Sequence, residues 1–217
     1  MDEKELILMF FNDRSHAGRL LAEALMKYSG KDTVVYALPR GGVVLGYEVS
    51  KMLGCPLDLV VTRKIGHPNN PEYAICAVSE NAPPICNQLE ISRLTEGWLD
   101  FQVSKQKGEI KRRKKTYPSP NISPKGKTAI IIDDGIATGL TIKSAIEEIK
   151  SQKPKLLIVA VPVSPKDTAE EISSNVDHLV CLDIQEYYLG AVGAYYADFS
   201  QVTDSEVVEL LYLANRT

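Results

Sequence analysis

Residues 130–141 read Ile130-Ile131-Ile132-Asp133-Asp134-Gly135-Ile136-Ala137-Thr138-Gly139-Leu140-Thr141, and this stretch decides the fold. It begins as an apolar run that predicts a buried strand, passes two acids, and enters a loop of small residues. The apolar spacing after the loop is that of a helix. In an open α/β sheet, ligands bind beyond the carboxyl ends of the strands. We therefore expect a ligand site at this junction.

The side chains at the junction indicate what the ligand is. The loop offers free N–H groups, the positive end of a helix dipole and the hydroxyls of Thr138 and Thr141, which together suit a phosphate monoester. Asp133 and Asp134 can accept hydrogen bonds from a vicinal diol or face a hydrated Mg²⁺. Phosphate, diol and metal describe a phosphorylated ribose. The alternative, a strand that merely ends in an acidic turn, does not explain why acids, threonines and glycine follow in this order.

Other phosphate-binding motifs fit this sequence less well. A Walker A loop needs a Lys where Leu140 stands, and Gly135 and Gly139 are one residue too close for it. The stretch 41–46 likewise lacks the spacing G-x-G-x-x-G.

Strands and helices alternate on both sides of the junction. Short apolar runs predict strands at 33–38, 57–62, 74–79, 128–132, 156–161 and 178–182. Continuous apolar strands are typical of a parallel sheet covered on both faces. We predict one α/β domain over residues 1–217, an open, mainly parallel sheet flanked by helices.

Two segments do not follow this alternation. Arg63 to Tyr73 is polar and rich in Pro, Asn and Gly, which predicts a mobile loop. Residues 88–117 predict a helical insertion that carries the basic run 111–115. We interpret that run as a solvated helix face, with a phosphate or partner contact as the alternative.

The composition limits the class of protein. Hydrophobic residues make up 44% of the 217 residues, charged residues make up 24%, and the net charge is −3. These values indicate a globular protein and argue against a surface built for nucleic acid. The apolar run 6–11 is too short for a signal peptide or a membrane span. The four cysteines form no C-x-x-C pair, so we expect reduced thiols, no zinc site and a cytoplasmic location.

The junction resembles the PRPP (5-phosphoribosyl 1-diphosphate) fingerprint of the type I phosphoribosyltransferases, which is four apolar residues, two acids and a Thr/Gly loop. Leu38-Pro39-Arg40-Gly41-Gly42 resembles the pyrophosphate loop of this family. Arg63-Lys64-Ile65-Gly66-His67-Pro68 resembles the start of its flexible catalytic loop. The whole chain is similar to a bacterial group of predicted phosphoribosyltransferases whose acceptor is unassigned.

The resemblance implies a role for each matching residue. The expected catalytic residues are Asp133, Asp134, Arg63 and Lys64. Arg63 and Lys64 are expected to begin a lid that closes over the leaving pyrophosphate. The expected substrate-binding residues are Arg40, Gly41, Gly42, Gly135, Ile136, Ala137, Thr138, Gly139 and Thr141. The two glycines would let the main chain approach a diphosphate in unusual φ/ψ. The expected cofactor is Mg²⁺, held mainly through PRPP, with contacts to the two acids left open.

The expected reaction transfers ribose 5-phosphate to a nitrogenous acceptor, such as a nucleobase, and releases pyrophosphate. Enzymes of the family that use 6-oxopurines carry an acid where Ala137 stands, which puts that acceptor class in doubt. A hood over the acceptor is expected from residues 1–14 and 183–202 and their aromatic side chains, namely Phe10, Phe11, Tyr187, Tyr188, Tyr195, Tyr196 and Phe199. The expected partners are PRPP and an acceptor that the sequence does not name, with no nucleic acid and no membrane, and a homodimer is left open.

Two other functions are compatible with the same fold. The first is a PRPP- or nucleotide-sensing regulator, although we see no separate DNA-binding motif. The second is an interaction module that has lost its chemistry, which the intact acids and threonines disfavour.

Overall fold

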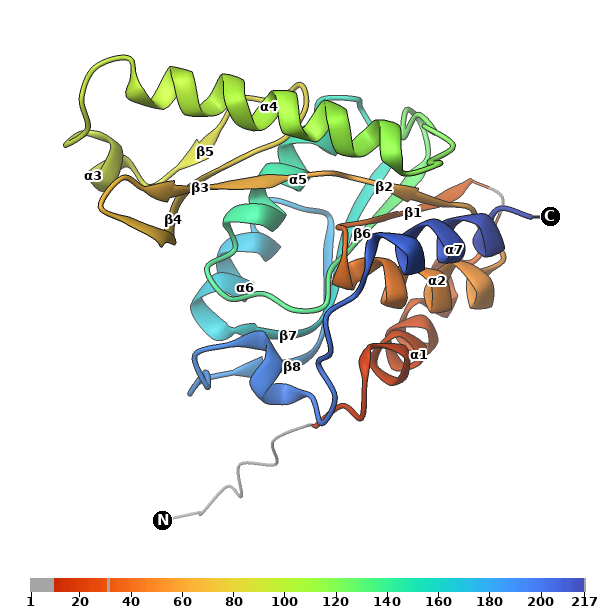
Figure 1. The fold of residues 1–217 in the computed structure, drawn as a ribbon. Helices are drawn as coiled ribbons and strands as arrows, with labels where there is room; N and C mark the ends of the chain where they lie inside the picture. The colour runs from red at the N-terminus through yellow and green to blue at the C-terminus, as the bar shows by residue number, and fades with distance from the viewer. Residues whose placement is uncertain (1–9, 31, 217) are drawn as a thin grey trace, which may run out of the picture.

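The structure is a computed structural model that describes residues 10–30 and 32–216. Its main sheet has five parallel strands in the order β2-β1-β6-β7-β8 (Figure 1). Their bounds are β1 Thr33–Ala37, β2 Leu57–Leu59, β6 Thr128–Ile132, β7 Leu156–Pro165 and β8 His178–Gln185. The predicted open parallel sheet is therefore confirmed. β2 is shorter than expected, and β7 and β8 run further.

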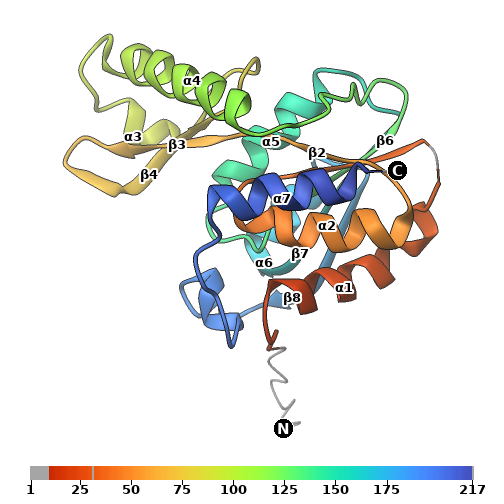
Figure 2. The ribbon, with the colours of Figure 1, turned by 45° about the vertical axis from the view of Figure 1, so that its right-hand side comes forward.

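Helices cover both faces of this sheet. One face carries α1 (Arg14–Leu25), α2 (Gly41–Leu53) and α7 (Asp204–Ala214), which lie side by side in Figure 2. The other face carries α5 (Leu140–Lys150) and α6 (Lys166–Ser173). The strands alternate between the two resulting cores, so that Val35 of β1 faces the first core and Val34 faces the second. Side chains on successive strand residues point to opposite faces, which explains why a strand buried on both sides reads as continuously apolar.

A smaller antiparallel sheet lies beside the main one, beneath a long helix (Figure 1). It contains β3 (Arg63–His67), β4 (Asn70–Val78) and β5 (Ile85–Cys86). The expectation that Arg63 to Tyr73 forms a loop is therefore wrong, because this segment forms most of a β-hairpin, and its mobility stays a prediction. Ile65 at the base of the hairpin is buried, whereas residues 68–73 are exposed. The polar composition of the segment thus reports an exposed hairpin tip.

The helical insertion is present but divided. α3 (Gln88–Ile91) and α4 (Trp98–Thr116) are separated by a turn that ends at Gly97, which has a φ of 77°. A left-handed residue cannot continue a helix, so the break lies where glycine permits it. The short 3-10 helices η1 (Met26–Tyr28) and η2 (Val192–Tyr195) complete the elements.

The cysteine prediction needs a correction. Cys76 and Cys86 lie opposite each other on β4 and β5 and are joined by a disulfide. The Cα atoms are 4.0 Å apart, as in the close pairs of an antiparallel ladder. Only Cys55 and Cys181 carry free thiols. The expectation of four reduced thiols failed because the pairing depends on strand register, which the spacing of cysteines does not reveal.

Within residues 10–30 and 32–216, no helix is long and apolar enough to span a membrane. The apolar run 6–11 lies mostly outside the described residues. Its last member, Phe11, is fully buried and forms an isolated parallel bridge with Tyr196.

Candidate active site

The loop after β6 exposes Ala137 and Thr138, whereas its Ile136 N–H donates to the Val163 carbonyl at 2.9 Å. Gly135 and Gly139 have φ of 153° and 74°, conformations that favour glycine. A Cβ at Gly135 would also lie 2.6 Å from Val192 Cγ1. Ala137 and Thr138 are exposed, and their N–H groups meet no acceptor among the described residues. α5 begins directly after Gly139, so its positive end faces the loop, as the sequence predicted.

The two acids differ in their surroundings. Asp133 Oδ1 accepts a hydrogen bond from the Asp134 N–H at 2.9 Å. Burial raises the pKa of Asp133 well above its usual range, and the negative charge of Asp134 adds to the rise, while the charge of Lys64 opposes it. Burial also raises the pKa of Asp134, but an ion pair with Arg14 counteracts it. The site therefore holds one carboxylate with a close cation and one without.

Arg14, in the first turn of α1, is a site residue that sequence reasoning missed. Its Nε donates to Asp134 Oδ2 at 2.8 Å, and its Nη1 donates to the Ser200 carbonyl at 2.7 Å. Its guanidinium carbon lies 3.7 Å from the centroid of the Phe199 ring. Only 11% of the Arg14 side chain is exposed. Arg14 thus joins an acid of the junction to the segment expected to form the hood.

The glycine pair at the start of α2 packs against the acids. Gly41 and Gly42 are helical and have no positive φ, so the expectation of unusual φ/ψ is wrong. A Cβ at Gly41 would overlap Asp134 Oδ2, and one at Gly42 would lie 2.8 Å from the Ile132 carbonyl oxygen. The glycines allow the N-terminus of α2 to pack directly against the acids. That end of the helix carries partial positive charge and favours a nearby carboxylate.

The structure brings nearly all the predicted site residues together. All except Gly42 line one cavity of about 540 Å³: Arg40, Gly41, Arg63, Lys64, Asp133, Asp134, Gly135, Ile136, Ala137, Thr138, Gly139 and Thr141. The same cavity is also lined by residues that were not predicted to contact PRPP, among them Arg14, Arg113, Val192 and Phe199. Arg40 is the N-cap residue of α2 and follows a cis peptide bond. The cavity carries five cationic side chains and two carboxylates, which suits a ligand with several negative charges.

The aromatic residues expected in the hood do not act together, because Phe10 and Tyr187 are exposed and Tyr188 is partly buried away from the cavity lining. Phe11 and Tyr195 are fully buried and Tyr196 nearly so, which makes them core residues. Phe199 lines the cavity, together with Val192 of η2. The Tyr196 hydroxyl donates to the Asp134 carbonyl oxygen at 2.6 Å, so this core residue supports the acid from behind.

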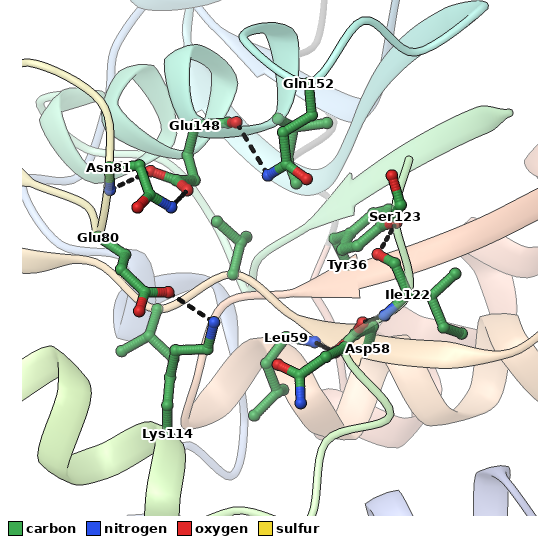
Figure 3. A pocket seen from close by; sticks show the side chains of 14 residues that line it. Tyr36, Asp58, Leu59, Glu80, Asn81, Lys114, Ile122, Ser123, Glu148 and Gln152 are labelled. Atoms are coloured by element: carbon green, nitrogen blue, oxygen red, sulfur yellow. Dashed lines mark hydrogen bonds and ion pairs between the residues drawn. The ribbon is translucent and has the colours of Figure 1, made fainter. Parts of the chain in front are cut away.

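A second cavity, of about 230 Å³, lies between α5, the end of β4 and the segment 121–123 (Figure 3). Its two buried carboxylates are already satisfied. Asp58 accepts hydrogen bonds from the Ile122 N–H and the Ser119 hydroxyl, and Glu148 accepts from the amides of Asn81 and Ala82. At its edge, Lys114 of α4 forms an ion pair with Glu80 at 2.6 Å. These contacts anchor loops and the end of α4 rather than leave groups free for a ligand.

The site offers few protein ligands for a metal. Among the described residues, no group of three or more His, Cys, Asp or Glu side chains could hold an ion. Asp133 Oδ2 and Asp134 Oδ1 remain without a hydrogen-bond donor in the described part of the chain. Mg²⁺ commonly binds through one or two carboxylates together with substrate phosphates. The residues fit a magnesium ion that arrives with a polyphosphate ligand and do not form a cage of their own.

Comparisons with known proteins agree with this site. The family model described as the phosphoribosyl transferase domain matches residues 14–198. The chain belongs to this family. Two proteins of Mycobacterium tuberculosis named "Putative phosphoribosyl transferase" are each 38% identical over 213 residues, which is 96% of this chain and 48% of theirs. The chain thus spans about half the length of the curated relatives it matches.

Solved structures show the same fold. TT1426 from Thermus thermophilus is 36% identical, with a TM-score of 0.76, over 94% of this chain and 98% of its own. A hypothetical protein from Neisseria gonorrhoeae, solved with bound ppGpp, is 15% identical and has a TM-score of 0.52. Its match covers 95% of this chain and 97% of its own, and it supports the fold alone.

Proposed function

We propose that this protein binds PRPP with Mg²⁺ and transfers ribose 5-phosphate to a nitrogenous acceptor, with release of pyrophosphate. One observation carries the proposal. A loop of free amides, two acids and a group of cations surround a single cavity, and these are the contacts that a monophosphate, a ribose diol and a diphosphate require.

The ribose 5-phosphate end of the substrate is assigned to the β6–α5 junction. The free amides of Ala137 and Thr138 and the hydroxyls of Thr138 and Thr141 would donate to the 5-phosphate. The free carboxylate oxygens of Asp133 and Asp134 would accept hydrogen bonds from the ribose hydroxyls. Carboxylates held at this position would also stabilise positive charge that develops on the ribose ring as the C1–O bond breaks.

The leaving group is assigned to the opposite side of the cavity. Arg40, Arg63 and Lys64 would bind the pyrophosphate that departs as the acceptor nitrogen forms its bond to C1. A bound Mg²⁺ would supply further neutralisation of the diphosphate charge. No covalent nucleophile is needed, because positioning and charge stabilisation are the catalytic contributions.

The acceptor would lie beside Phe199 and Val192. No acid stands at position 137, where Ala137 is exposed to the cavity. The acceptor must therefore be recognised by other groups, and a nucleobase stacked on Phe199 is one that the site would accommodate.

The test is turnover. We expect the protein to release pyrophosphate from PRPP and Mg²⁺ in the presence of one member of a panel of nucleobases, amines and ammonia. The double variant Asp133→Asn/Asp134→Asn should remain folded and should lower this turnover by on the order of a hundredfold or more. Calorimetric PRPP binding without turnover for any acceptor would favour the sensing alternative. Absence of both binding and turnover would refute the proposal.

A further inference from the structure

One member of the basic run on α4 reaches the cavity. The run was interpreted as a solvated helix face, and Lys111 and Lys115 are indeed exposed. Arg113 instead lines the same cavity as Arg40 and Arg63. Three elements far apart in sequence, the start of α2, strand β3 and helix α4, each place one arginine there.

α4 is docked firmly enough to fix the position of Arg113. Ile110, one turn earlier, is fully buried. Lys114 pairs with Glu80 at 2.6 Å, and the Lys107 ammonium group donates to the Ala82 carbonyl at 3.2 Å. The Tyr117 hydroxyl, just past the end of the helix, donates to Asp204 at 2.6 Å. Contacts on both sides of Arg113 therefore hold this part of the helix against the rest of the domain.

Arg113 has spare hydrogen-bonding capacity. Its one ion pair among the described residues is with Glu109, and the Nε–Oε1 distance is 3.4 Å. Glu109 is held more closely by Arg112, at 2.7 Å and 2.8 Å in a two-bond arrangement. A guanidinium group has five N–H donors, so most of those on Arg113 remain available for a ligand.

Arg63 and Arg113 lie close enough for their positive charges to repel each other. Burial lowers the pKa of Arg63, and the positive charges of Arg113 and Arg112 lower it further, while Glu109 opposes them. Burial raises the pKa of Tyr117 to about 12, and the charges of Arg113 and Arg40 oppose that rise, so both guanidinium groups lie near this hydroxyl. The Nη1 atom of Arg40 lies 3.7 Å from Oδ1 of Asp204. Within the described residues, this is the only carboxylate that pairs with Arg40. An anion bound beside Arg63 and Arg113 would offset the repulsion between their charges.

The location of the group indicates which anion binds. The amide loop 135–139 faces α6 and η2, because Gly139 packs against Thr168 and Gly135 packs against Val192. Arg40 and Arg113 lie near Tyr117 and Asp204, on the side of α4 and α7, and the Arg63 Nε donates to Gln106 of α4 at 3.2 Å. The cavity thus has an amide-rich end for a monophosphate and an arginine-rich end with three forked cations. Forked guanidinium groups bind phosphate oxygens in pairs and suit a diphosphate.

We propose that Arg113 completes a three-arginine site for a diphosphate group, which on the function proposed above is the pyrophosphate of PRPP. The insertion that contains α4 is then part of the ligand site. It contributes a cation that neither the junction 130–141 nor the glycine-containing loop supplies.

The experiment is calorimetry of three ligands, each with Mg²⁺: inorganic pyrophosphate, PRPP and ribose 5-phosphate. Arg113→Gln should weaken pyrophosphate and PRPP roughly tenfold or more, because hydrogen bonds to charged groups are lost, and should leave ribose 5-phosphate unchanged. Lys111→Gln and Lys115→Gln remove one charge each from the same run and should change none of the three affinities. Circular dichroism and Tm establish that each variant is folded, and Arg113→Lys, which keeps the charge without the fork, should recover part of the lost affinity.

Unchanged pyrophosphate affinity in Arg113→Gln would overturn the inference. An equal loss for all three ligands would also overturn it, since that result indicates a structural role. If the wild-type protein binds pyrophosphate in an Arg113-dependent manner but does not bind PRPP, the diphosphate site stands and the proposed function fails.

Discussion

Asp133 and Asp134 are adjacent in sequence but lie in different electrostatic environments. Asp134 has Arg14 at 2.8 Å, and 17% of its side chain is exposed. Asp133 has no ion pair among the described residues, and burial raises the pKa of its carboxyl group. A buried carboxylate without a cation costs stability at neutral pH, whereas a paired one loses little. The two acids should therefore respond in opposite ways to the same substitution.

We predict that Asp133→Asn raises the Tm and that Asp134→Asn lowers it. Because the folded pKa of Asp133 is raised, the native state binds more protons than the unfolded state above the usual Asp range, and stability falls as the pH rises through that window. Removing the charge should add roughly 1 kcal/mol at pH 7 to 8, or about 2–4 °C, with the gain vanishing near pH 4. Asp134→Asn leaves the Arg14 charge without its partner, at a cost of about 1–3 kcal/mol.

Thermal unfolding of both variants between pH 4 and pH 8 measures these effects. The same direction of change in both variants, or a gain for Asp133→Asn that does not depend on pH, would contradict the assignment of unequal environments. Asp13→Asn is not a suitable control, because that side chain caps α1. Asp100→Asn, at an exposed position in the first turn of α4, is the matched control and should change little.

At the residue scale, the sequence reveals the contacts that are local and hides those that are not. The acids, the loop glycines and the threonines lie within 12 residues, so a motif could find them. Arg14 is 120 residues from its partner Asp134, and no local pattern marks it as different from other surface arginines. Arg113 was within the basic run, but the packing of α4 through contacts such as the buried Ile110 determines that it faces this cavity while Lys111 and Lys115 face solvent.

At the scale of elements, the β3–β4 hairpin is the part that the sequence described least well. Its tip is polar and exposed, which was interpreted as a loop, and its base is formed by Ile65 and the buried residues 75–78. The spacing of apolar residues and the local composition predict a strand where one of its faces is buried. They fail at an exposed tip, where only the partner strand supplies hydrogen bonds. The strands β1 and β6, which are buried on both faces, were predicted to within one residue because burial fixes their composition, whereas β2, β7 and β8 were located but their carboxyl ends were not.

The hairpin should act as a two-part element in hydrogen exchange. Amides of Cys76 to Val78 should be strongly protected, while those of residues 67–72 exchange quickly, because few buried contacts oppose local opening of the tip. If the hairpin closes over the ligand, PRPP with Mg²⁺ should slow exchange at the tip. Amides in the middle of α2 serve as the internal control and should not change. Strong protection of the tip without ligand would show that this hairpin is rigid and that a lid, if the reaction uses one, lies elsewhere.

At the scale of the whole molecule, charge and packing are distributed differently. The net charge is −3, yet five cations line one cavity, so the overall charge gave no indication of the anion site. Unlike the cations, which gather at one cavity, the buried apolar residues form a core that extends across the elements of the chain. Ile65, Ile75 and Ile110 of the small sheet and α4 belong to one continuous buried cluster with residues of α1 and α2, such as Leu21 and Val49. The insertion therefore shares its core with the helices that cover the parallel sheet.

We predict, accordingly, that heat unfolds the chain in one cooperative transition and that diphosphate ligands shift that transition as a whole. A ligand at 100 times its Kd adds ~2.7 kcal/mol to the free energy of unfolding, which for a chain of this size raises the Tm by roughly 5–10 °C. Calorimetry with PRPP and Mg²⁺, or with pyrophosphate and Mg²⁺, measures the shift, and sulfate at matched ionic strength is the control for nonspecific anion effects. Because α4 shares its core with α1 and α2, spectroscopic signals from Trp98 and from total helix content should change at the same temperature. Trp98 is the only tryptophan, so a separate, earlier transition of its signal would show that α4 and the small sheet unfold on their own. A ligand that shifted only that earlier transition would locate its binding energy in the insertion rather than in the parallel sheet.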